Sequence, residues 1–415
     1  MFASCAGDVP MTAMRPIRET IPLEQALDLL LRNLTPIART ERVPLDRANG
    51  RVLAHAVTSP VDVPPFDRAA MDGYAVRAED TFGASRSEPA TLRRVATIFT
   101  GDTAPLPLSA GDCMEIATGA PIPPGADAVV MVEETETAGE DRVRVMTPVF
   151  PRQHIGRRAA DIAAGQTILP AGQLLNPSRV GAIAAIGAAD VEVFARPTVA
   201  VISTGNEIVD PGQPLAPGQI HDINRFTLSA VIAEHGGIPV AMRTAADSLE
   251  ALEGAITSAA KADVLVFSGG SSVGTRDLVL DAIRQRGQVI FHGIAVKPGK
   301  PTAFGRIGGK PVLGMPGYPA SCLSNGYILL VPLLRRIAQL PAYQPRVARL
   351  PLGRRIVSPT GRHQFYTVKV TENGAMPAFK GSGDITSMSQ ADGYIEIPTH
   401  TDIVEAGEIV EVKFF

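Results

Sequence analysis

The sequence predicts a multidomain protein of α/β and β structure. Its 415 residues suffice for two to four domains of ordinary size. Residues 196–340 alternate β-branched runs with helical ones, which indicates a central α/β domain with a parallel sheet covered by helices on both faces. Residues 51–150 and 341–415 contain short β-rich runs separated by proline and glycine, which are typical of small β domains.

The N-terminal part is expected to form a split domain of helical and mixed structure. Thr20 is a candidate N-cap, and leucines repeat at three- and four-residue spacing from Leu23 to Leu34. A second apolar helix is expected to begin near Pro177. We predict that the two helices pack together and complete one domain around a β-rich insertion. The predicted boundaries are 15–50 and 151–195 for the split domain and 51–150 for the β-rich domain.

The central domain is expected to hold its elements in a regular order. Strands are predicted at 198–203, 239–242, 263–268, 289–292, 302–305 and 312–315, and helices at 225–235, 248–261, 277–286 and 319–339. After a linker at 341–345, the chain is expected to end in a small β-barrel-like domain, with strands at 366–370, 394–397 and 409–415. In an open α/β sheet the ligand site forms from the loops at the carboxyl ends of the strands.

Composition narrows the classes of partner. The chain has 39 Lys+Arg against 42 Asp+Glu, so we expect no nucleic-acid partner. No apolar stretch approaches the roughly 18 residues that span a bilayer, so we expect no membrane partner. Cys5, Cys113 and Cys322 are far apart and in no CxxC spacing, which supports neither a disulfide framework nor a zinc site. We therefore expect a cytoplasmic protein.

Two loops after central strands carry residues suited to an anion. In Ser203-Thr204-Gly205-Asn206-Glu207, hydroxyls and a glycine can approach an anion, and Glu207 can hold a metal or orient a substrate amine; a capping turn is the alternative. The segment 268–277, which includes Gly269, Gly270, Ser271 and Ser272, opens a helix, so its backbone N–H groups can cradle a phosphate. It is neither a P-loop nor a GxGxxG fingerprint.

Two further loops add cations and helix starts. The turn 296–301 places Lys297 and Lys300 among prolines, and the resulting stiffness lowers the entropic cost of holding two cations near one anion. The segment 314–321 runs from a strand into a helix, with Pro319 suited to the first turn. The four loops together predict an anion-binding crevice with a divalent metal.

Several assignments stay open on residue patterns alone. Asp247 and Asp277 each stand at a helix start, where an aspartate is either a plain cap or a Mg²⁺ ligand. In the β-rich region, composition does not separate a binding edge from a structural turn at 65–75 and 117–123. The seven histidines show no HxH or HxxxH spacing, so neither a histidine metal cluster nor a Ser-His-Asp triad can be read from the sequence.

A series of motifs resembles the MoeA family of molybdopterin molybdenumtransferases, which are similar to the E domain of gephyrin. The resemblance runs in order over about residues 15–415. It is carried by FDRAAMDGYA (66–75), TGAPIP (118–123), RRAADI (157–162), STGNE (203–207), HDINR (221–225), SGGSSVGTRD (268–277), KPGKP (297–301) and MPGYPAS (315–321).

The resemblance implies an elongated, four-part protomer acting as a homodimer, with an α/β domain of the molybdopterin-binding type. The implied reaction is insertion of molybdate into adenylylated molybdopterin, with Mg²⁺-dependent hydrolysis of the adenylate and release of AMP. The molybdopterin adenylyltransferase is a further implied partner.

The resemblance also implies roles for individual residues. Catalytic roles are implied for Glu207, Asp247, Asp277, Lys297 and Lys300, with Mg²⁺ on Asp247 or Asp277. A molybdate pocket is implied at Lys297, Lys300, Pro301, Ser321, Arg362 and Ser382. Substrate binding is implied for Asp161, Ser203, Thr204, Asp222, Asn224, Gly269, Gly270, Ser271, Ser272, Pro316 and Pro319. Asp67, Met71, Asp72 and Thr118 are implied to come from the partner subunit and to close the crevice.

The sequence departs from the family pattern at three places. Tyr318 stands where the family usually has Asn, Arg276 stands where a small residue or Lys is usual, and the second basic residue common after Phe365 is absent. We still expect a working enzyme, with altered anion affinity or a preference for tungstate. The alternatives are the molybdopterin adenylyltransferase itself, against which the length argues, and a non-catalytic gephyrin-like scaffold, which would need long linkers or an extra domain.

Overall fold

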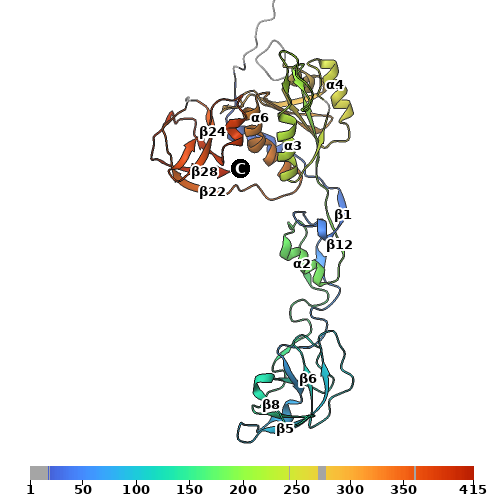
Figure 1. The fold of residues 1–415 in the computed structure, drawn as a ribbon. Helices are drawn as coiled ribbons and strands as arrows, with labels where there is room; N and C mark the ends of the chain where they lie inside the picture. The colour runs from blue at the N-terminus through green and yellow to red at the C-terminus, as the bar shows by residue number, and fades with distance from the viewer. Residues whose placement is uncertain (1–16, 18, 243, 270–276, 359–360) are drawn as a thin grey trace, which may run out of the picture. The chain divides into compact units, whose positions relative to one another are not determined.

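The computed structural model describes residues 17, 19–242, 244–269, 277–358 and 361–415. The chain divides into two compact units, Met1–Glu41 with Phe194–Phe415 (unit 1) and Arg42–Val193 (unit 2). Figure 1 shows the elements of both. Among the described residues, no helix has the length and apolar character needed to cross a membrane.

Unit 1 is built on a six-stranded sheet. The strand order is β16 (Ile238–Ala241), β13 (Thr198–Ser203), β17 (Val264–Ser268), β21 (Lys310–Met315), β20 (Ala303–Ile307) and β18 (Gly287–His292). The first four strands are parallel, whereas β20 runs antiparallel to both of its neighbours. The predicted parallel sheet is therefore a mixed one, because the short β20–β21 hairpin reverses the chain.

Helices cover both faces of this sheet, as predicted. In β13, Val199 and Val201 belong to one apolar core and Ala200 and Ile202 to the other, as the period of two along a strand requires. The first core includes side chains of α1 (Leu23–Arg32), α3 (Asn224–Glu234), α6 (Pro319–Asn325) and α7 (Val331–Ile337). The second includes side chains of α4 (Leu249–Ser258) and α5 (Leu278–Arg286).

Two helix predictions need correction. Thr20 does not cap α1: Ile21 forms a parallel bridge with Ile294, which keeps the chain extended there, and the cap position falls on Pro22. The expected packing of α1 against the helix near Pro177 is also wrong. Ala26 and Leu30 lie in the first core of unit 1, because α1 presents its apolar face to the sheet domain. The boundaries of the four predicted domains stay a prediction.

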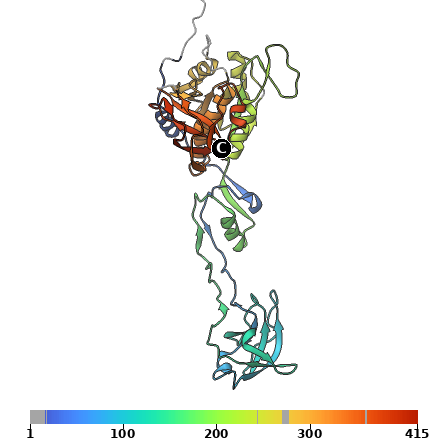
Figure 2. The ribbon, with the colours of Figure 1, turned by 60° about the vertical axis from the view of Figure 1, so that its left-hand side comes forward.

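A second sheet in unit 1 forms the C-terminal β part, seen as red strands in Figure 2. Its order is β19 (Val296–Lys297), β24 (His363–Thr371), β26 (Gly393–Ile397), β28 (Ile409–Phe414) and β22 (Val347–Pro351), with β25 (Gly374–Pro377) also paired to β24. Smaller elements are β23 (Ile356–Val357), β27 (Ile403–Val404) and α8 (Thr386–Ser389). Because β19 precedes β20 in the chain, the two sheets of unit 1 are joined directly at Val296–Lys297.

Unit 2 contains a six-stranded sheet of its own, in the order β7 (Ala128–Met131), β4 (Gly73–Val76), β6 (Asp112–Ile116), β5 (Ala90–Ile98), β9 (Arg142–Val145) and β8 (Thr135–Thr137). Two-stranded pairs are β1 (Thr40–Pro44) with β12 (Asp190–Phe194), β2 (Val57–Thr58) with β11 (Thr167–Leu169), and β3 (Arg68–Ala69) with β10 (Ile155–Gly156). α2 (Pro177–Ala185) begins where expected, with Asn176 as N-cap accepting a hydrogen bond from Arg179 N. The sheet separates two apolar cores, one of them around Val130 and the other around Met114.

Candidate functional site

The carboxyl ends of three parallel strands of unit 1 lie in register. Ser203 of β13 pairs with Ser268 of β17, and Ser268 pairs with Met315 of β21. The residues that follow these three therefore lie side by side at one edge of the sheet, as the sequence predicted. Thr204 N donates to Ser268 O at 2.9 Å, and Gly269 N donates to Met315 O at 3.3 Å.

Gly269 is required by the close approach of two of these loops. Its φ is +98°, and a Cβ on it would lie 2.5 Å from Thr204 O. Any side chain would therefore push the two strand ends apart. The neighbouring Gly270, Ser271 and Ser272, predicted to cradle phosphate, lie outside the described residues.

Buried polar atoms without partners gather at this edge. Ser203 Oγ, Thr204 Oγ1 and Asn224 Oδ1 are buried and have no hydrogen-bond partner in the part of the chain that the structure describes. Asn224 Nδ2 donates to Gly317 O at 2.7 Å, so this amide lies beside the loop that follows β21. Asp222 accepts from Arg225 N with one oxygen, and its other oxygen forms an ion pair with Arg225, 3.5 Å from Nε. Since buried polar groups are normally paired, these atoms indicate a place for a polar ligand.

Asp277 serves as the N-cap of α5. Its Oδ1 accepts from Leu280 N at 2.9 Å, and its Oδ2 lies 3.3 Å from Nε2 of His292. His292 ends β18 and pairs with Ala303 at the start of β20, at the same edge of the sheet. The sequence patterns did not single out His292, because its partner is 15 residues away and on another element.

Asp247 and Glu207 lie at the first loop. Asp247 N donates to Asn206 Oδ1 at 3.1 Å, and Thr204 forms a parallel bridge with Ala245, so the 203–207 loop is tied to the segment before α4. The side chains of Asp247 and Glu207 are both exposed. Within the described residues, no group of three or more His, Cys, Asp or Glu side chains is placed to hold a metal ion by itself.

The lysine turn lies at the same edge. Ala303, which follows it, pairs with Gly314 near the end of β21, so Lys297, Lys300 and Pro301 precede β20 beside the β21 loop. Lys300 Nζ donates to Ile17 O at 2.7 Å. An ammonium group has three donors, so this bond leaves two for an anion.

The C-terminal β part contacts the start of α6. Ala320 N donates to Ser382 O at 3.1 Å, which brings Ser382 beside Ser321, itself buried. Pro316 is buried in the preceding loop, and Pro319 is the first residue of α6. Arg362 is exposed and directly precedes His363, whose N donates to Ala295 O at 2.8 Å. The structure thus brings most of the predicted molybdate set to one region of unit 1.

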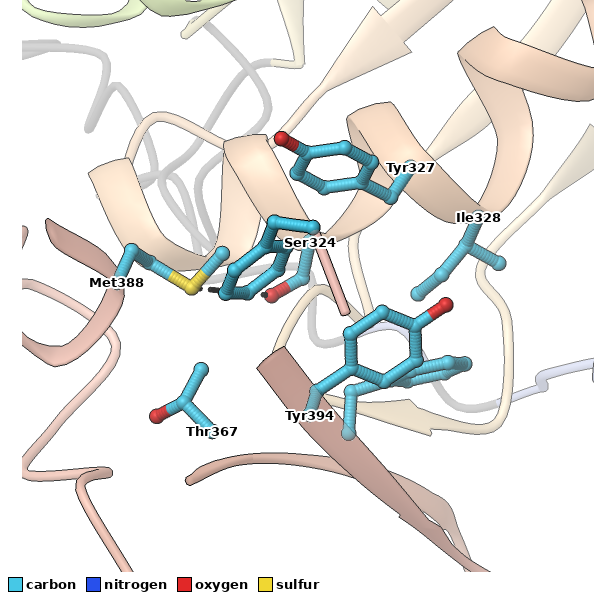
Figure 3. Close-up of a pocket in the computed structure, with 8 residues that line it drawn as sticks. Ser324, Tyr327, Ile328, Thr367, Met388 and Tyr394 are labelled. Carbon is cyan, nitrogen blue, oxygen red and sulfur yellow. Dashed lines mark hydrogen bonds between the residues drawn. The ribbon is translucent and has the colours of Figure 1, made fainter. Parts of the chain in front are cut away.

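Figure 3 shows the side of α6 that faces the C-terminal β part. Ser324 and Tyr327 come from the helical segment, and Thr367, Met388 and Tyr394 from the C-terminal part. The cavity between them holds only about 10 Å³, which is room for one water molecule. It is therefore a packing seam and not a substrate site.

In unit 2, three of the quoted motifs form one surface. Asp72 Oδ1 accepts from Thr118 N at 2.7 Å and from Thr118 Oγ1 at 2.9 Å. Asp67 Oδ1 accepts from Arg158 N at 2.7 Å, and Met71 is exposed next to Asp72. Asp161 is exposed on the same stretch as Arg158. Residues far apart in the chain thus meet here, as a binding surface or a structural junction would require.

Known protein families and individual relatives match the chain over nearly its whole length. Three family models match in order: the MoeA N-terminal region (domain I and II) over residues 21–187, a probable molybdopterin binding domain over 200–336, and the MoeA C-terminal region (domain IV) over 349–415. A relative from Mycobacterium tuberculosis, molybdopterin molybdenumtransferase 2, is 37% identical over 96% of this chain and 99% of its own. A molybdopterin molybdenumtransferase from Haemophilus influenzae is 32% identical over 95% of this chain and 98% of its own.

A solved structure also matches the chain over nearly its whole length. The MoeA molybdopterin biosynthesis protein of Pyrococcus horikoshii superposes with a TM-score of 0.83 at 42% identity, covering 95% of this chain and 99% of that one. Fold and site together define a multidomain protein whose α/β part is of the molybdopterin-binding class. The chain belongs to the MoeA family.

Proposed function

We propose that this protein is a molybdopterin molybdenumtransferase of molybdenum cofactor biosynthesis. It inserts molybdate into adenylylated molybdopterin, while the adenylate is hydrolysed and AMP is released. The observation that carries the proposal is the register of Ser203, Ser268 and Met315 at one edge of a sheet whose domain matches a molybdopterin-binding family. The relatives named molybdopterin molybdenumtransferase support the transfer of molybdenum to molybdopterin.

The phosphates of the substrate are proposed to bind at the ends of β13 and β17. Among the residues that the structure describes, the buried hydroxyls of Ser203 and Thr204 have no hydrogen-bond partner, so they can donate to phosphate oxygens. Gly269 lets backbone approach the same place, and Gly270, Ser271 and Ser272 would add donors. Asp222, Asn224, Pro316 and Pro319 would shape the neighbouring part of the pocket.

Molybdate is a tetrahedral dianion and needs cations and donors from several directions. Lys297 and Lys300 supply the cations, on the turn that precedes β20. Ser321 and Ser382, held beside each other by the bond from Ala320 N to Ser382 O, supply polar groups, and Pro301 and Arg362 complete the proposed set.

The carboxylates fit Mg²⁺ unequally. Mg²⁺ usually binds one or two carboxylates together with substrate phosphates, so a complete protein cage is not required. Asp247 is exposed at the loop edge and fits this pattern, whereas one oxygen of Asp277 caps α5 and the other faces His292. When bound, Mg²⁺ would offset negative charge on the leaving phosphate. Glu207 is proposed to orient the substrate from the loop that holds Asp247.

A homodimer is proposed as the working form. Asp67, Met71, Asp72 and Thr118 of unit 2 would then act on the substrate held by the partner subunit, and Asp161 is proposed to bind substrate as well. The adenylyltransferase that makes the substrate is proposed as a further partner, and the cytoplasm as the compartment.

The test is AMP release from purified adenylylated molybdopterin, measured with and without molybdate and Mg²⁺. We expect release to require both. Lys297→Ala should raise the molybdate concentration for half-maximal rate about tenfold, because one of two cations is lost. Absence of AMP release by the folded wild-type dimer would reject the enzyme. Formation of the adenylylated compound from ATP and molybdopterin would instead identify the adenylyltransferase.

A further inference from the structure

Asn325 joins the lysine turn to α6. It is the last residue of α6 and is completely buried. Its Nδ2 donates to Gly299 O at 2.9 Å and to Thr302 Oγ1 at 2.6 Å. Gly299 lies on the turn that carries the two lysines, and Thr302 follows this turn directly. A single amide therefore holds this turn against a helix more than 20 residues further along the chain.

The contact is closely fitted. Thr302 Oγ1 also donates to Gly299 O at 2.9 Å, so three groups share one small network. Gly299 has a φ of +107°, and a Cβ on it would lie 2.5 Å from Asn325 Oδ1. The turn can therefore approach the amide only because residue 299 is glycine. The orientation of the amide is set by its partners, because a reversed amide would point oxygen at the carbonyl of Gly299.

α6 is also held at its first turn and along the side that faces the C-terminal β part. Its first turn bears Ser321, and Ala320 N donates to Ser382 O at 3.1 Å. Ser324, adjacent to Asn325, lies in the seam with the C-terminal β part in Figure 3. Immediately after Asn325 the helix changes to a π-helical turn, Gly326–Leu330. Asn325 thus lies where the lysine turn and a helix fixed in place by two contacts meet.

We infer that Asn325 is a positioning residue for the oxyanion pocket: it holds Lys297 and Lys300 at the distance from Ser321 that molybdate requires. The inference rests on the proposed function and deepens it. It makes Asn325 important for molybdate binding although its side chain is too deeply buried to touch the substrate. A pocket with two cations on a loop needs such support, since a binding group displaced by about 1 Å no longer meets its ligand in the required geometry.

The experiment compares Asn325→Leu and Asn325→Asp with the wild type. Leucine keeps the size and removes the donors without adding charge, whereas aspartate puts an acceptor opposite the carbonyl of Gly299. Thr302→Val removes one acceptor without changing the helix and serves if the Asn325 variants do not fold. Gln339→Leu is the matched control, because Gln339 Nε2 donates to the carbonyl of Ile37 at 2.6 Å, away from the turn.

Three quantities are measured: KM for molybdate, the Kd for AMP, and hydrogen exchange of peptides covering residues 293–303. We expect Asn325→Leu to raise the molybdate KM at least tenfold and to speed exchange in this segment, with kcat and the AMP Kd changed less than threefold. Gln339→Leu should leave the molybdate KM within twofold of wild type.

Two results would overturn the inference. One is a molybdate KM within twofold of wild type in folded Asn325→Leu or Thr302→Val, whatever the exchange rates. The other is a loss of kcat with an unchanged KM. A wild-type protein that binds AMP but never releases it from adenylylated molybdopterin would instead reject the proposed function, so the two failures can be told apart.

Discussion

Asp72 Oδ1 accepts two hydrogen bonds from one residue, Thr118, through its backbone N at 2.7 Å and its hydroxyl at 2.9 Å. These two bonds hold the pKa of Asp72 below its ordinary value although the side chain is exposed, and the backbone bond has the larger effect. The pair fixes the turn before β4 to the turn after β6. A surface carboxylate in unit 2 is thereby held ionised and in one orientation.

The first prediction concerns this pair. Thr118→Val should raise the pKa of Asp72 toward its ordinary value, because the hydroxyl bond is lost while the backbone bond remains. Thr118→Ser keeps the hydroxyl and should leave the pKa unchanged. NMR titration of the Asp72 carboxyl carbon measures both. If the proposed dimer is correct, Thr118→Val should also raise the KM for adenylylated molybdopterin, and equal KM values for the two variants would contradict that role.

Much of the site could be predicted because its parts are local in sequence. A buried β-branched run followed by a serine and a glycine indicates where a strand ends and a loop begins. Ser203, Ser268 and Met315 then lie in register because the strands are parallel neighbours. The order of the loops in the chain was sufficient to place them at one edge.

The features that could not be predicted from the sequence include contacts between segments far apart in the chain. Asn325 looks like an ordinary polar residue in an apolar helix, and its partners lie 26 and 23 residues earlier in the chain. The predicted continuous helix at 319–339 is interrupted by the π turn before Pro332, which lacks the N–H that a regular helix would bond. The period of apolar residues detects neither effect, since packing decides the contacts of Asn325 and the missing N–H of Pro332 leaves the apolar spacing unchanged.

The second prediction concerns Asp263, which joins three segments of unit 1. Its carboxylate accepts from Arg39 at 2.6 Å and from Thr198 N and Oγ1 at 2.7 and 2.8 Å. Burial raises the pKa of Asp263, but the bonds from Arg39 and Thr198 outweigh it and lower the pKa overall. Asp263→Asn should lower the free energy of unfolding of unit 1 by about 2 kcal/mol at neutral pH.

The pH dependence gives a second measurement of the same group. A folded pKa below the unfolded one contributes stability above the unfolded pKa, and that contribution is lost as pH falls through the folded pKa. The difference in the free energy of unfolding between wild type and Asp263→Asn should therefore become smaller below about pH 4. Glu253→Gln is the control in the same unit, since Glu253 faces Arg286 at 3.9 Å on the surface. This substitution should change the free energy of unfolding by less than about 1 kcal/mol.

The third prediction uses two glycines of opposite character. Gly269→Ala should destabilise unit 1, because the residue has a positive φ and a Cβ would lie 2.5 Å from Thr204 O. Gly254→Ala should stabilise it by about 0.5–1 kcal/mol, because this glycine lies inside α4 with open space around it. Thermal unfolding of the two variants should therefore shift in opposite directions. A Gly269→Ala protein as stable as wild type would show that the two strand ends can separate.

The last prediction separates two roles of Asp277. As a helix cap, Asp277 can be replaced by asparagine, which caps equally well, whereas Asp277→Ala should lower the free energy of unfolding by about 1 kcal/mol. As a charged group beside His292, Asp277 can be replaced by neither asparagine nor alanine, because both side chains are neutral. If the negative charge takes part in the reaction, both variants lose molybdate-dependent AMP release while only the alanine variant is less stable. If Asp277 is only a cap, Asp277→Asn keeps full activity and stability, and Mg²⁺ then depends on Asp247 alone. Calorimetry and AMP release on the same preparations distinguish the two roles, with Asp281→Asn as control, a partly buried carboxylate of α5 that faces Arg284 at 3.7 Å.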